Sequence, residues 1–356
     1  MSIEPGILES HLEELATDYY DLQASLANHF QQPPTALEAL RMTSKGHPTV
    51  IHGFSPMLAA GETDWRQPES YIKVQGETPL TIAVTDDGLA DSVRTLADGT
   101  TSFVKPLDET MTMTAFLARL TGQDESRDEA LYLQSQDGNI YRSEPGARGS
   151  PELATFQSVV ARDVSWMKEA SGESAEAVNL WIGNSKSTTS FHHDPYENIY
   201  HVLSGSKTFT LLSPIDGLWF EQQFHAPSTL VRTADGKLEP QLDEPPAHPV
   251  PWVEDLDAPP QSRPVTVVLQ EGETLYLPAG WWHKVEQSEG STGLAVAVNY
   301  WYASEINPQR YALERLAQRV ARTAGRDVLP VDIVDEDVWG SEVDSADEWD
   351  PKDWGR

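Results

Sequence analysis

Three side chains of this sequence have the types and spacing of a metal site. His192 and Asp194 stand two positions apart, so on an extended strand they share one face. His283 follows much later in the chain, behind another strand-like run. Two imidazoles and one carboxylate leave three adjacent positions of an octahedral metal open, which is the arrangement of non-haem Fe(II) oxygenases. His192, Asp194 and His283 are therefore the predicted metal ligands and catalytic centre.

The histidine between the first two is not expected to bind the metal. On a strand His193 points away from the face that carries His192 and Asp194, so we predict a surface or packing role for it. A single histidine near a carboxylate is more often structural, so the interpretation depends on His283. That residue follows a strand and a Pro-Gly turn, which can carry a rigid ligand to the mouth of a barrel. Its two tryptophan neighbours could shield the site, although core packing is their more frequent role.

The open metal positions also predict an anionic ligand. A chelating 2-oxo acid would fill two of them, and its far carboxylate would then need a buried cation and hydroxyl donors. Lys207 is the candidate cation, because a hairpin turn at Gly205 would bring it to the same cavity. Thr189 and Tyr132 could supply hydroxyl groups, and the near carboxylate could be held by Asn198 and Asn299.

The elements that precede these residues are expected to be two helices and a set of short strands. Apolar side chains recur at spacings of three and four over residues 8–30, which predicts an amphipathic helix that Pro33 ends. This helix could pack on the chain's own sheet or form a dimer. Over residues 50–104 short apolar runs alternate with turn signals and predict strands; residues 108–120 look helical, and residues 132–134 again predict a strand.

The densest strand signals lie in residues 179–302. They predict a hairpin over residues 198–212 and further strands at residues 265–269, 274–277 and 294–300. Short strands at this spacing indicate a sandwich or jelly roll rather than a βαβ sheet. Residues 226–264 are rich in proline and acidic side chains, which predicts a long covering loop anchored by Trp252.

The end of the sequence predicts a helix and then an acidic tail. Residues 305–323 have helical spacing, and the candidate buried positions are Tyr311, Leu313, Leu316 and Val320. An acidic tail is ordinarily disordered, but Trp339, Trp349 and Trp354 indicate that parts of this one dock on the domain or on a partner. We therefore divide the chain into an N-terminal helical segment (1–45), a catalytic domain (46–304), a C-terminal helix (305–325) and a tail (326–356).

Composition limits the partners and the location. The 356 residues carry a formal net charge of -31, and affinity for nucleic-acid phosphates comes largely from Lys and Arg, so no direct nucleic-acid binding is expected. The charge first confers solubility, and it is compatible with a basic protein substrate. The absence of Cys and of a secretory signal predicts a cytoplasmic or nuclear protein without disulfides. No apolar run approaches the roughly 18–20 residues that cross a bilayer, so no membrane insertion is expected.

Four runs of the sequence together resemble the Jumonji-C (cupin-like) oxygenases: His192–Asn198, Ser204–Lys207, Leu275–His283 and Val298–Tyr302. Thr81–Asp91 and Tyr132–Gln134 narrow the similarity to one branch of that family. The resemblance covers roughly residues 10–320 and leaves out the acidic tail and much of residues 226–264. Pro195 and the enlarged proline-rich segment depart from the family pattern, so substrate contacts are less defined than metal ligation.

The resemblance implies a mainly β fold, a double-stranded β-helix (jelly roll) with flanking helices at both ends. It implies Fe(II) bound by His192, Asp194 and His283, with 2-oxoglutarate and O₂ as cosubstrates. The distal carboxylate of 2-oxoglutarate would contact Lys207, Thr189 and Tyr132, and the metal end would be flanked by Asn198 and Asn299. All of these residue types are present.

The reaction that the resemblance implies is hydroxylation of a lysine carbon in a protein, with conversion of 2-oxoglutarate to succinate and CO₂. Developmentally regulated GTP-binding proteins are the family's substrates, so the expected partner is a protein with a basic, lysine-containing segment. A homodimer through the terminal helices is a further expectation.

Three other interpretations remain open from the sequence. The same iron site would serve a histone lysine demethylase or an asparaginyl hydroxylase. A zinc hydrolase also uses two histidines and a carboxylate, but it would not need the anion pocket of Lys207, Thr189 and the two asparagines. A non-catalytic cupin-like binding protein would be expected to have an incomplete ligand set, whereas this one is complete.

Overall fold

The computed structural model describes residues 5–22, 27–58, 63–123, 128–135, 138–142, 151–245, 248–254, 256–305 and 308–328. The predicted acidic tail with its three tryptophans therefore lies almost entirely outside the described residues. None of the described helices combines the length and the apolar character that a membrane span requires.

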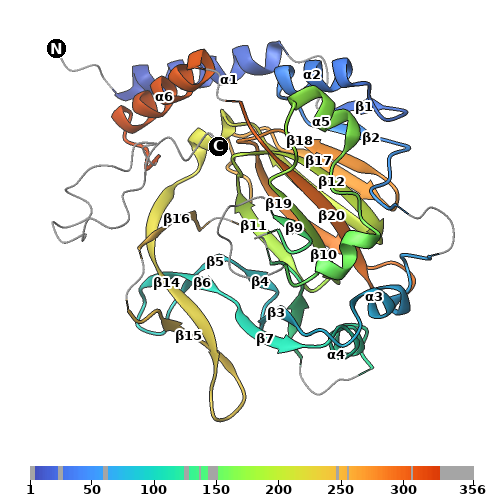
Figure 1. The fold of residues 1–356 in the computed structure, drawn as a ribbon. Helices are drawn as coiled ribbons and strands as arrows, with labels where there is room; N and C mark the ends of the chain where they lie inside the picture. The colour runs from blue at the N-terminus through green and yellow to red at the C-terminus, as the bar shows by residue number, and fades with distance from the viewer. Residues whose placement is uncertain are drawn as a thin grey trace.

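Two large sheets face each other and form the centre of the molecule (Figure 1). The seven-stranded sheet has the order β1 (Asn28–Phe30), β2 (Thr49–Ile51), β18 (Thr274–Leu277), β12 (Tyr196–Ser204), β20 (Ala295–Ala303), β10 (Ala177–Gly183) and β9 (Tyr141–Arg142). The five-stranded sheet has the order β17 (Val265–Gln270), β13 (Ser206–Leu212), β19 (Trp282–Ser288), β11 (Thr188–His192) and β4 (Leu89–Ala90). The predicted fold class, a mainly β jelly roll, is confirmed.

Two smaller sheets and a set of helices surround this centre. One small sheet has the order β15 (Leu238–Leu242), β14 (Gln222–Arg232), β6 (Thr101–Lys105) and β5 (Ser92–Thr95), with β16 (Val250–Val253) also paired to β14. The other is β7 (Leu107–Met111), β3 (Leu80–Thr85) and β8 (Ala130–Tyr132). The helices are α1 (Pro5–Asp21), α2 (Ala36–Lys45), α3 (Pro68–Gln75), α4 (Met113–Leu120), α5 (Ser165–Ser171) and α6 (Pro308–Thr323), with 3₁₀ turns at Ala154–Ser158 and Asp216–Trp219.

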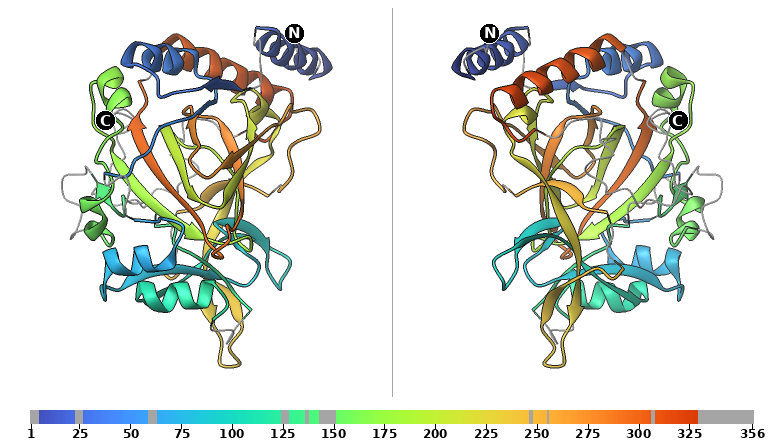
Figure 2. Two further views of the ribbon diagram at one scale, coloured as in Figure 1. Left: turned by 90° about the vertical axis from the view of Figure 1, so that its right-hand side faces the viewer. Right: turned by 90° about the vertical axis from the view of Figure 1, so that its left-hand side faces the viewer.

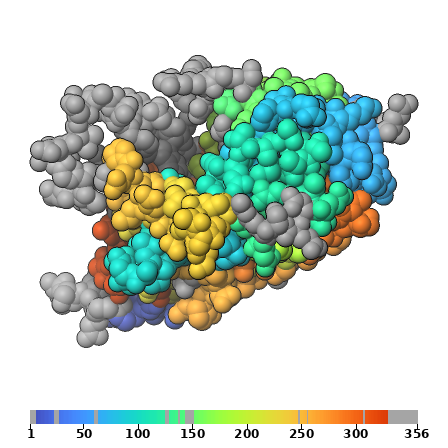
Figure 3. Space-filling model, turned by 90° about the horizontal axis from the view of Figure 1, so that it is seen from below, coloured from blue at the N-terminus to red at the C-terminus, as the bar shows by residue number. Residues whose placement is uncertain are grey.

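The helices gather at opposite ends of the large sheets. Figure 2 shows α1, α2 and α6 at one end and α3 and α4 at the other. Viewed from below, the β14–β15 region (yellow) and the α4 region (teal) lie at the surface (Figure 3). The helices nearest the two ends of the chain, α1 and α6, pack together, since Leu12 of α1 shares a small buried cluster with Ala317 and Ala321 of α6.

Alternation along the strands places two different cores on the two faces of the seven-stranded sheet. In β20, Val296, Val298 and Tyr300 join the core on the outer, helix-covered face. Ala297 and Trp301 instead point inward and pack against residues of the five-stranded sheet such as Phe209. The outer face of the five-stranded sheet is more open, because β17 alternates strictly between buried and exposed positions. The interior between the sheets is thus the space in which a site can form.

The predicted hairpin over residues 198–212 is wrong. β12 belongs to the seven-stranded sheet and β13 to the five-stranded sheet, so the two strands do not pair. Gly205 carries the chain from one sheet to the other with φ of 71°, and a Cβ at this position would lie 2.4 Å from the carbonyl oxygen of Ser288. Only glycine fits this crossover. Lys207 still reaches the interior, but from the opposite wall.

The predicted loop over residues 226–264 is also wrong, because the segment contains most of β14 and all of β15 and β16. Its prolines suggested a loop. Pro240 and Pro251, however, lie on β15 and β16. Among the described strands each of these two pairs with β14 alone, and such outer strands tolerate residues that cannot donate a ladder hydrogen bond.

Two helix boundaries differ from the prediction. The first helix ends at Asp21, and Phe30 lies in β1 instead. β1 pairs in parallel with β2 at the edge of the sheet, and this pairing provides hydrogen-bond partners for its backbone groups. Residues 108–111 form part of β7 rather than of a helix, because they pair with β3. α4 begins only after Thr112, whose side chain accepts a hydrogen bond from the Ala115 backbone nitrogen.

The C-terminal helix forms where predicted, but it buries a different face. Tyr311, Leu313 and Leu316 are exposed, and Val320 is only partly buried. The face that packs on the molecule carries the small residues Ala317 and Ala321, which allow close approach. The predicted homodimer through the terminal helices stays a prediction, as does the division of the chain into four segments.

Candidate metal centre and cosubstrate pocket

The structure brings the three predicted metal ligands together. His192 is the cross-strand partner of His283 in the β11–β19 pair, and the two ring centroids lie 4.1 Å apart. The Nε2 atom of His283 is 3.6 Å from Oδ2 of Asp194. One potential ligand atom from each residue falls within 4.8 Å of the others, and among the described residues no other group of three His, Cys, Asp or Glu does so.

Backbone carbonyls fix the orientation of both imidazoles. Nδ1 of His192 lies 2.9 Å from the Ser190 carbonyl oxygen, and Nδ1 of His283 lies 3.0 Å from that of Trp281. A hydrogen bond from Nδ1–H to a carbonyl leaves Nε2 as the lone-pair nitrogen. Both Nε2 atoms are therefore available for one metal ion.

The turn that carries His283 is tied directly to the strand end that carries the carboxylate. The backbone nitrogen of Gly280 donates to the carbonyl oxygen of Asp194 at 2.8 Å. Burial lowers the pKa of His283 well below its usual range, and the neighbouring His192 lowers it further. The neutral imidazole that results is the form that binds metal ions.

His193 lies outside the cluster, as the strand alternation predicts. It is exposed, and its ring meets the edge of Trp282 with centroids 4.6 Å apart. Trp282 in turn packs on Phe220 in a small buried cluster. Trp282 therefore has a packing role.

A ladder of inward-facing residues connects the metal cluster to the predicted cation. Across β13 and β19 the inward pairs are Leu211 with His283, then Phe209 with Val285, then Lys207 with Gln287. Lys207 thus lies on the same face as His283, two inward positions along the strand. The metal residues and the buried cation share one interior.

Thr189 joins this face through an irregularity in β11. A regular strand would place Thr189 and His192 on opposite faces, because they are three positions apart. The register shifts between them, so Thr189 opposes Val285 while His192 opposes His283, and both partners face inward. Thr189 therefore lines the interior, half-buried, although the structure gives no hydrogen bond from its side chain to Lys207.

Lys207 is fully buried and has only neutral hydrogen-bond partners among the described residues. Its Nζ donates to the Tyr132 hydroxyl at 3.2 Å and to Oε1 of Gln287. Burial lowers the pKa of Lys207 to about 7. No carboxylate of the described residues forms an ion pair with this lysine, so none of them balances its charge.

The same pocket contains a buried donor without a partner. The Nε2 atom of Gln287 is inaccessible and makes no hydrogen bond within the described structure, which is costly for an amide unless a ligand accepts the bond. Gly183 of β10 faces this pocket from the opposite sheet: a Cβ there would lie 2.5 Å from Gln287 Nε2 and 2.7 Å from Cδ2 of Tyr132. A cation, a hydroxyl and a free N–H donor around space kept open by glycine fit the distal carboxylate of a 2-oxo acid.

We expect Gly183→Ala to weaken binding of 2-oxoglutarate about tenfold or more, and to lower stability by roughly 1–3 kcal/mol, because the new methyl group overpacks the pocket. The backbone of Gly183 does not require glycine, so the effect would be steric. Gly6→Ala is the matched control, since its Cβ would meet nothing within 4 Å. Isothermal titration and thermal unfolding measure both effects; equal behaviour of the two variants would show that the pocket lies elsewhere.

The two predicted asparagines meet at the other wall of the interior. Asn299 Nδ2 donates to Oδ1 of Asn198 at 3.1 Å, and Oδ1 of Asn299 accepts from Trp181 Nε1 at 2.9 Å and from Asn179 Nδ2 at 3.2 Å. These bonds fix both amides. They leave Asn198 Nδ2 without a described partner and free to donate to an anion at the metal end.

Trp252 and Ser190 were not predicted as site residues. The Trp252 ring stacks on His192 at an interplanar angle of 9° and a centroid distance of 6.0 Å, and its Nε1 donates to Ser190 Oγ at 3.1 Å. The sequence identified Trp252 only as the anchor of a covering segment. Gln287 and Gly183 were missed as well, because one glutamine or glycine carries no recognisable signal.

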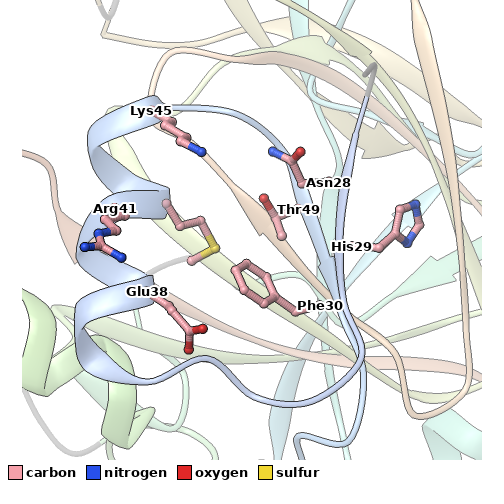
Figure 4. Close-up of a pocket in the computed structure, with 8 residues that line it drawn as sticks. Asn28, His29, Phe30, Glu38, Arg41, Lys45 and Thr49 are labelled. Carbon is pink, nitrogen blue, oxygen red and sulfur yellow. The ribbon is translucent and has the colours of Figure 1, made fainter. Parts of the chain in front are cut away.

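A separate surface pocket does not involve any predicted site residue. It has a volume of ≈ 270 Å³ between α2 and the β1–β2 edge. In Figure 4, Glu38, Arg41 and Lys45 come from the helix and Phe30 from the strand, while His29 points away from the helix. Charges of both signs line it, so it is not specific for anions or cations. We interpret it as the packing gap between α2 and the edge of the sheet.

The fold and the three converging ligands define a cupin-like protein with a two-histidine, one-carboxylate site. The family model of the cupin-like domain matches residues 34–307. The bifunctional peptidase and (3S)-lysyl hydroxylase JMJD7 of Homo sapiens is 31% identical over 90% of this chain and 98% of its own length. The lysine-specific demethylase JMJ32 of Arabidopsis thaliana is 32% identical over 79% of this chain and 82% of its own. JmjC domain-containing protein E of Dictyostelium discoideum is 28% identical over 82% of this chain and 91% of its own length.

The chain therefore belongs to the cupin-like domain family and, within it, to the JmjC proteins. This membership identifies it as a 2-oxoglutarate-dependent oxygenase, the enzyme class that the sequence predicts.

Proposed function

We propose that this chain is an Fe(II)- and 2-oxoglutarate-dependent protein hydroxylase that acts on lysine. The observation that carries the proposal is the shared interior: three converging ligands at one end and the buried cation Lys207 at the other. A hydrolytic zinc site would not require a buried cation such as Lys207. The residues present therefore fit both the metal and the cosubstrate.

The side chains would divide the work of holding the reactants. His192, Asp194 and His283 would bind Fe(II), while Lys207, Tyr132 and the free N–H of Gln287 would bind the distal carboxylate of 2-oxoglutarate. Iron and 2-oxoglutarate, when bound, supply the oxidation of an unactivated C–H bond with O₂.

The protein's own contribution is orientation and exclusion of water. Backbone carbonyls hold the imidazoles, the asparagine network holds the amide of Asn198, and Trp252 covers the His192 ring. These contacts keep the geometry fixed before the substrate arrives.

The proposed substrate is a lysine in a basic protein segment. Two observations support this substrate class. The chain has a formal net charge of -31, which would attract a basic partner. The human relative named above is a lysyl hydroxylase by name. A GTP-binding protein of the developmentally regulated class is the proposed target, and a cytoplasmic or nuclear location is proposed with it.

Lysine demethylation is the second candidate function, because JMJ32, a relative of similar identity, is named a lysine-specific demethylase. Both reactions use the same iron site. They differ in their products, since a hydroxylated methyl group is lost from nitrogen whereas a hydroxylated side-chain carbon is stable. Asparaginyl hydroxylation would likewise differ in the residue that gains oxygen.

The test is incubation of the protein with Fe(II), 2-oxoglutarate and matched peptides that contain lysine, methylated lysine or asparagine, followed by mass spectrometry. We expect one oxygen atom to be gained on the unmethylated lysine peptide. Loss of a methyl group without stable oxygen gain would replace hydroxylase by demethylase, and oxygen gain only on asparagine would change the residue specificity.

The affinity for 2-oxoglutarate should fall as the pH rises above about 7. Burial lowers the pKa of Lys207 to about 7, so in the free protein the amine loses its proton above that pH and binding of the distal carboxylate then requires proton uptake. Linkage limits the fall to about tenfold per pH unit. Titrations between about pH 6 and pH 9 measure it; pyruvate, a 2-oxo acid without the distal carboxylate, is the control ligand. A dependence equal for both ligands would contradict the assignment of Lys207.

A further inference from the structure

Asp91 lies beside the metal cluster in a strained conformation. It follows β4, whose residue Ala90 pairs with Thr189 of β11, and it precedes β5. Its φ is 55°, the only positive value of a non-glycine residue within the described ranges. Glycine would adopt this left-handed conformation at lower cost. The aspartate thus occupies a position that the backbone conformation alone would favour for glycine.

Ser190 links Asp91, Trp252 and the metal ligand His192 through hydrogen bonds. Its hydroxyl donates to the Asp91 carbonyl oxygen at 2.9 Å and accepts from Trp252 Nε1 at 3.1 Å. Its own carbonyl accepts from Nδ1 of His192. Because that carbonyl already orients the His192 ring, the Asp91 carboxylate is not needed for this purpose.

The Asp91 carboxylate lies near His192 and Lys105, which both lower its pKa, but it is in direct ion-pair contact with neither. It accepts one hydrogen bond, from Gln134 Nε2 to Oδ2 at 3.2 Å, and no Lys or Arg of the described residues forms an ion pair with it. The nearby Asp86 and Asp87 differ, because both are paired with Arg94. Burial raises the pKa of Asp91, and His192 partly opposes this effect. A partly buried acid without a direct ion-pair partner is costly for the protein alone.

We infer that Asp91 and Trp252 form the recognition site for the ammonium group of the target lysine. This inference rests on the proposed function and names the feature of the substrate that is recognised. The Trp252 ring stacks on His192 and meets Phe103 with ring centroids 4.9 Å apart. The proposed cation would therefore form an ion pair with Asp91 and a cation–π contact with the part of the Trp252 ring that these two neighbours leave uncovered. An ammonium ion there would balance the charge of Asp91 while the lysine side-chain carbons lie toward the metal.

The test compares a lysine peptide with the same peptide containing norleucine, which keeps the carbon chain and lacks the ammonium group. Asp91→Asn is the variant, because asparagine also tolerates a left-handed backbone. We expect the ratio of kcat/KM for lysine over norleucine to fall about tenfold or more in the variant, as for loss of a hydrogen bond to a charged group. Damage to the iron centre affects both peptides and cancels in the ratio.

Two further variants make the result specific. Trp252→Leu should lower the same ratio, though less than Asp91→Asn does. Asp98→Asn removes an equal charge from the exposed turn between β5 and β6 and should leave the ratio unchanged. A ratio unaltered by Asp91→Asn, with lysine hydroxylation intact, would overturn the inference and leave the proposed function standing. If the unaltered protein oxidises neither peptide, the proposed function itself fails.

Discussion

Replacing Asp194 by alanine should abolish 2-oxoglutarate turnover. The substitution removes the one carboxylate of the cluster and leaves two imidazoles, of which His283 is buried. Changes to residues that merely support metal ligands cost about 10–100-fold in metal affinity or activity, so loss of a ligand should exceed that range. Iron content after dialysis and the rate of succinate formation measure the two consequences.

His193→Ala is the matched control for this experiment. It removes an imidazole one position away that is exposed and meets the edge of Trp282. We expect turnover and iron content close to those of the unaltered protein. Retained turnover in the Asp194 variant, or equal losses in the two variants, would remove Asp194 from the metal site.

Replacing Lys207 by methionine should separate stability from cosubstrate binding. Methionine has a similar shape without charge, so the variant loses the cation that would pair with the distal carboxylate. Truncating one partner of a buried charge pair costs roughly 2–5 kcal/mol, which corresponds to a rise of about 30-fold or more in the Kd for 2-oxoglutarate. Stability without ligand should be unchanged or higher, because a buried amine no longer has to be accommodated.

Thermal unfolding with and without 2-oxoglutarate measures both parts of this prediction. The unaltered protein should gain stability from the ligand, and the Lys207 variant should gain little at the same ligand concentration. Lys186→Met is the control, since that lysine is surface-exposed and pairs with Asp128. Undiminished ligand stabilisation in the Lys207 variant would show that the distal carboxylate binds elsewhere.

The parts of the site that the sequence predicts well follow from local rules. The two-residue period of a strand is enough to put His192 and Asp194 on one face and His193 on the other. The strand, turn and strand around His283 can be recognised from the sequence by the same local rules. The density of short strands indicates the jelly roll. In each case the signal and the structure lie within one short segment.

The remaining features depend on which strands meet, and local periodicity does not carry that information. A hairpin and a crossover between sheets have similar sequence patterns around Gly205, yet they place Lys207 on different walls. The shift in register that turns Thr189 inward is a property of the β11–β19 pair. Gln287 and Asp91 acquire meaning only from neighbours distant in the sequence. The high proline content of residues 226–264 likewise predicts a loop, although β16 is the strand that brings Trp252 to the site.

The most direct test of the central claim compares two products of one reaction. The protein is incubated with Fe(II), 2-oxoglutarate, a lysine peptide and isotopically labelled O₂, and succinate is measured together with labelled oxygen on the peptide. We predict equal molar amounts of succinate and oxygenated lysine, with both absent in the Asp194→Ala variant. Labelled peptide without succinate would contradict the account of a 2-oxoglutarate-dependent lysine hydroxylase. Succinate formation that the peptide does not stimulate, with no labelled oxygen on the peptide, would contradict it as well.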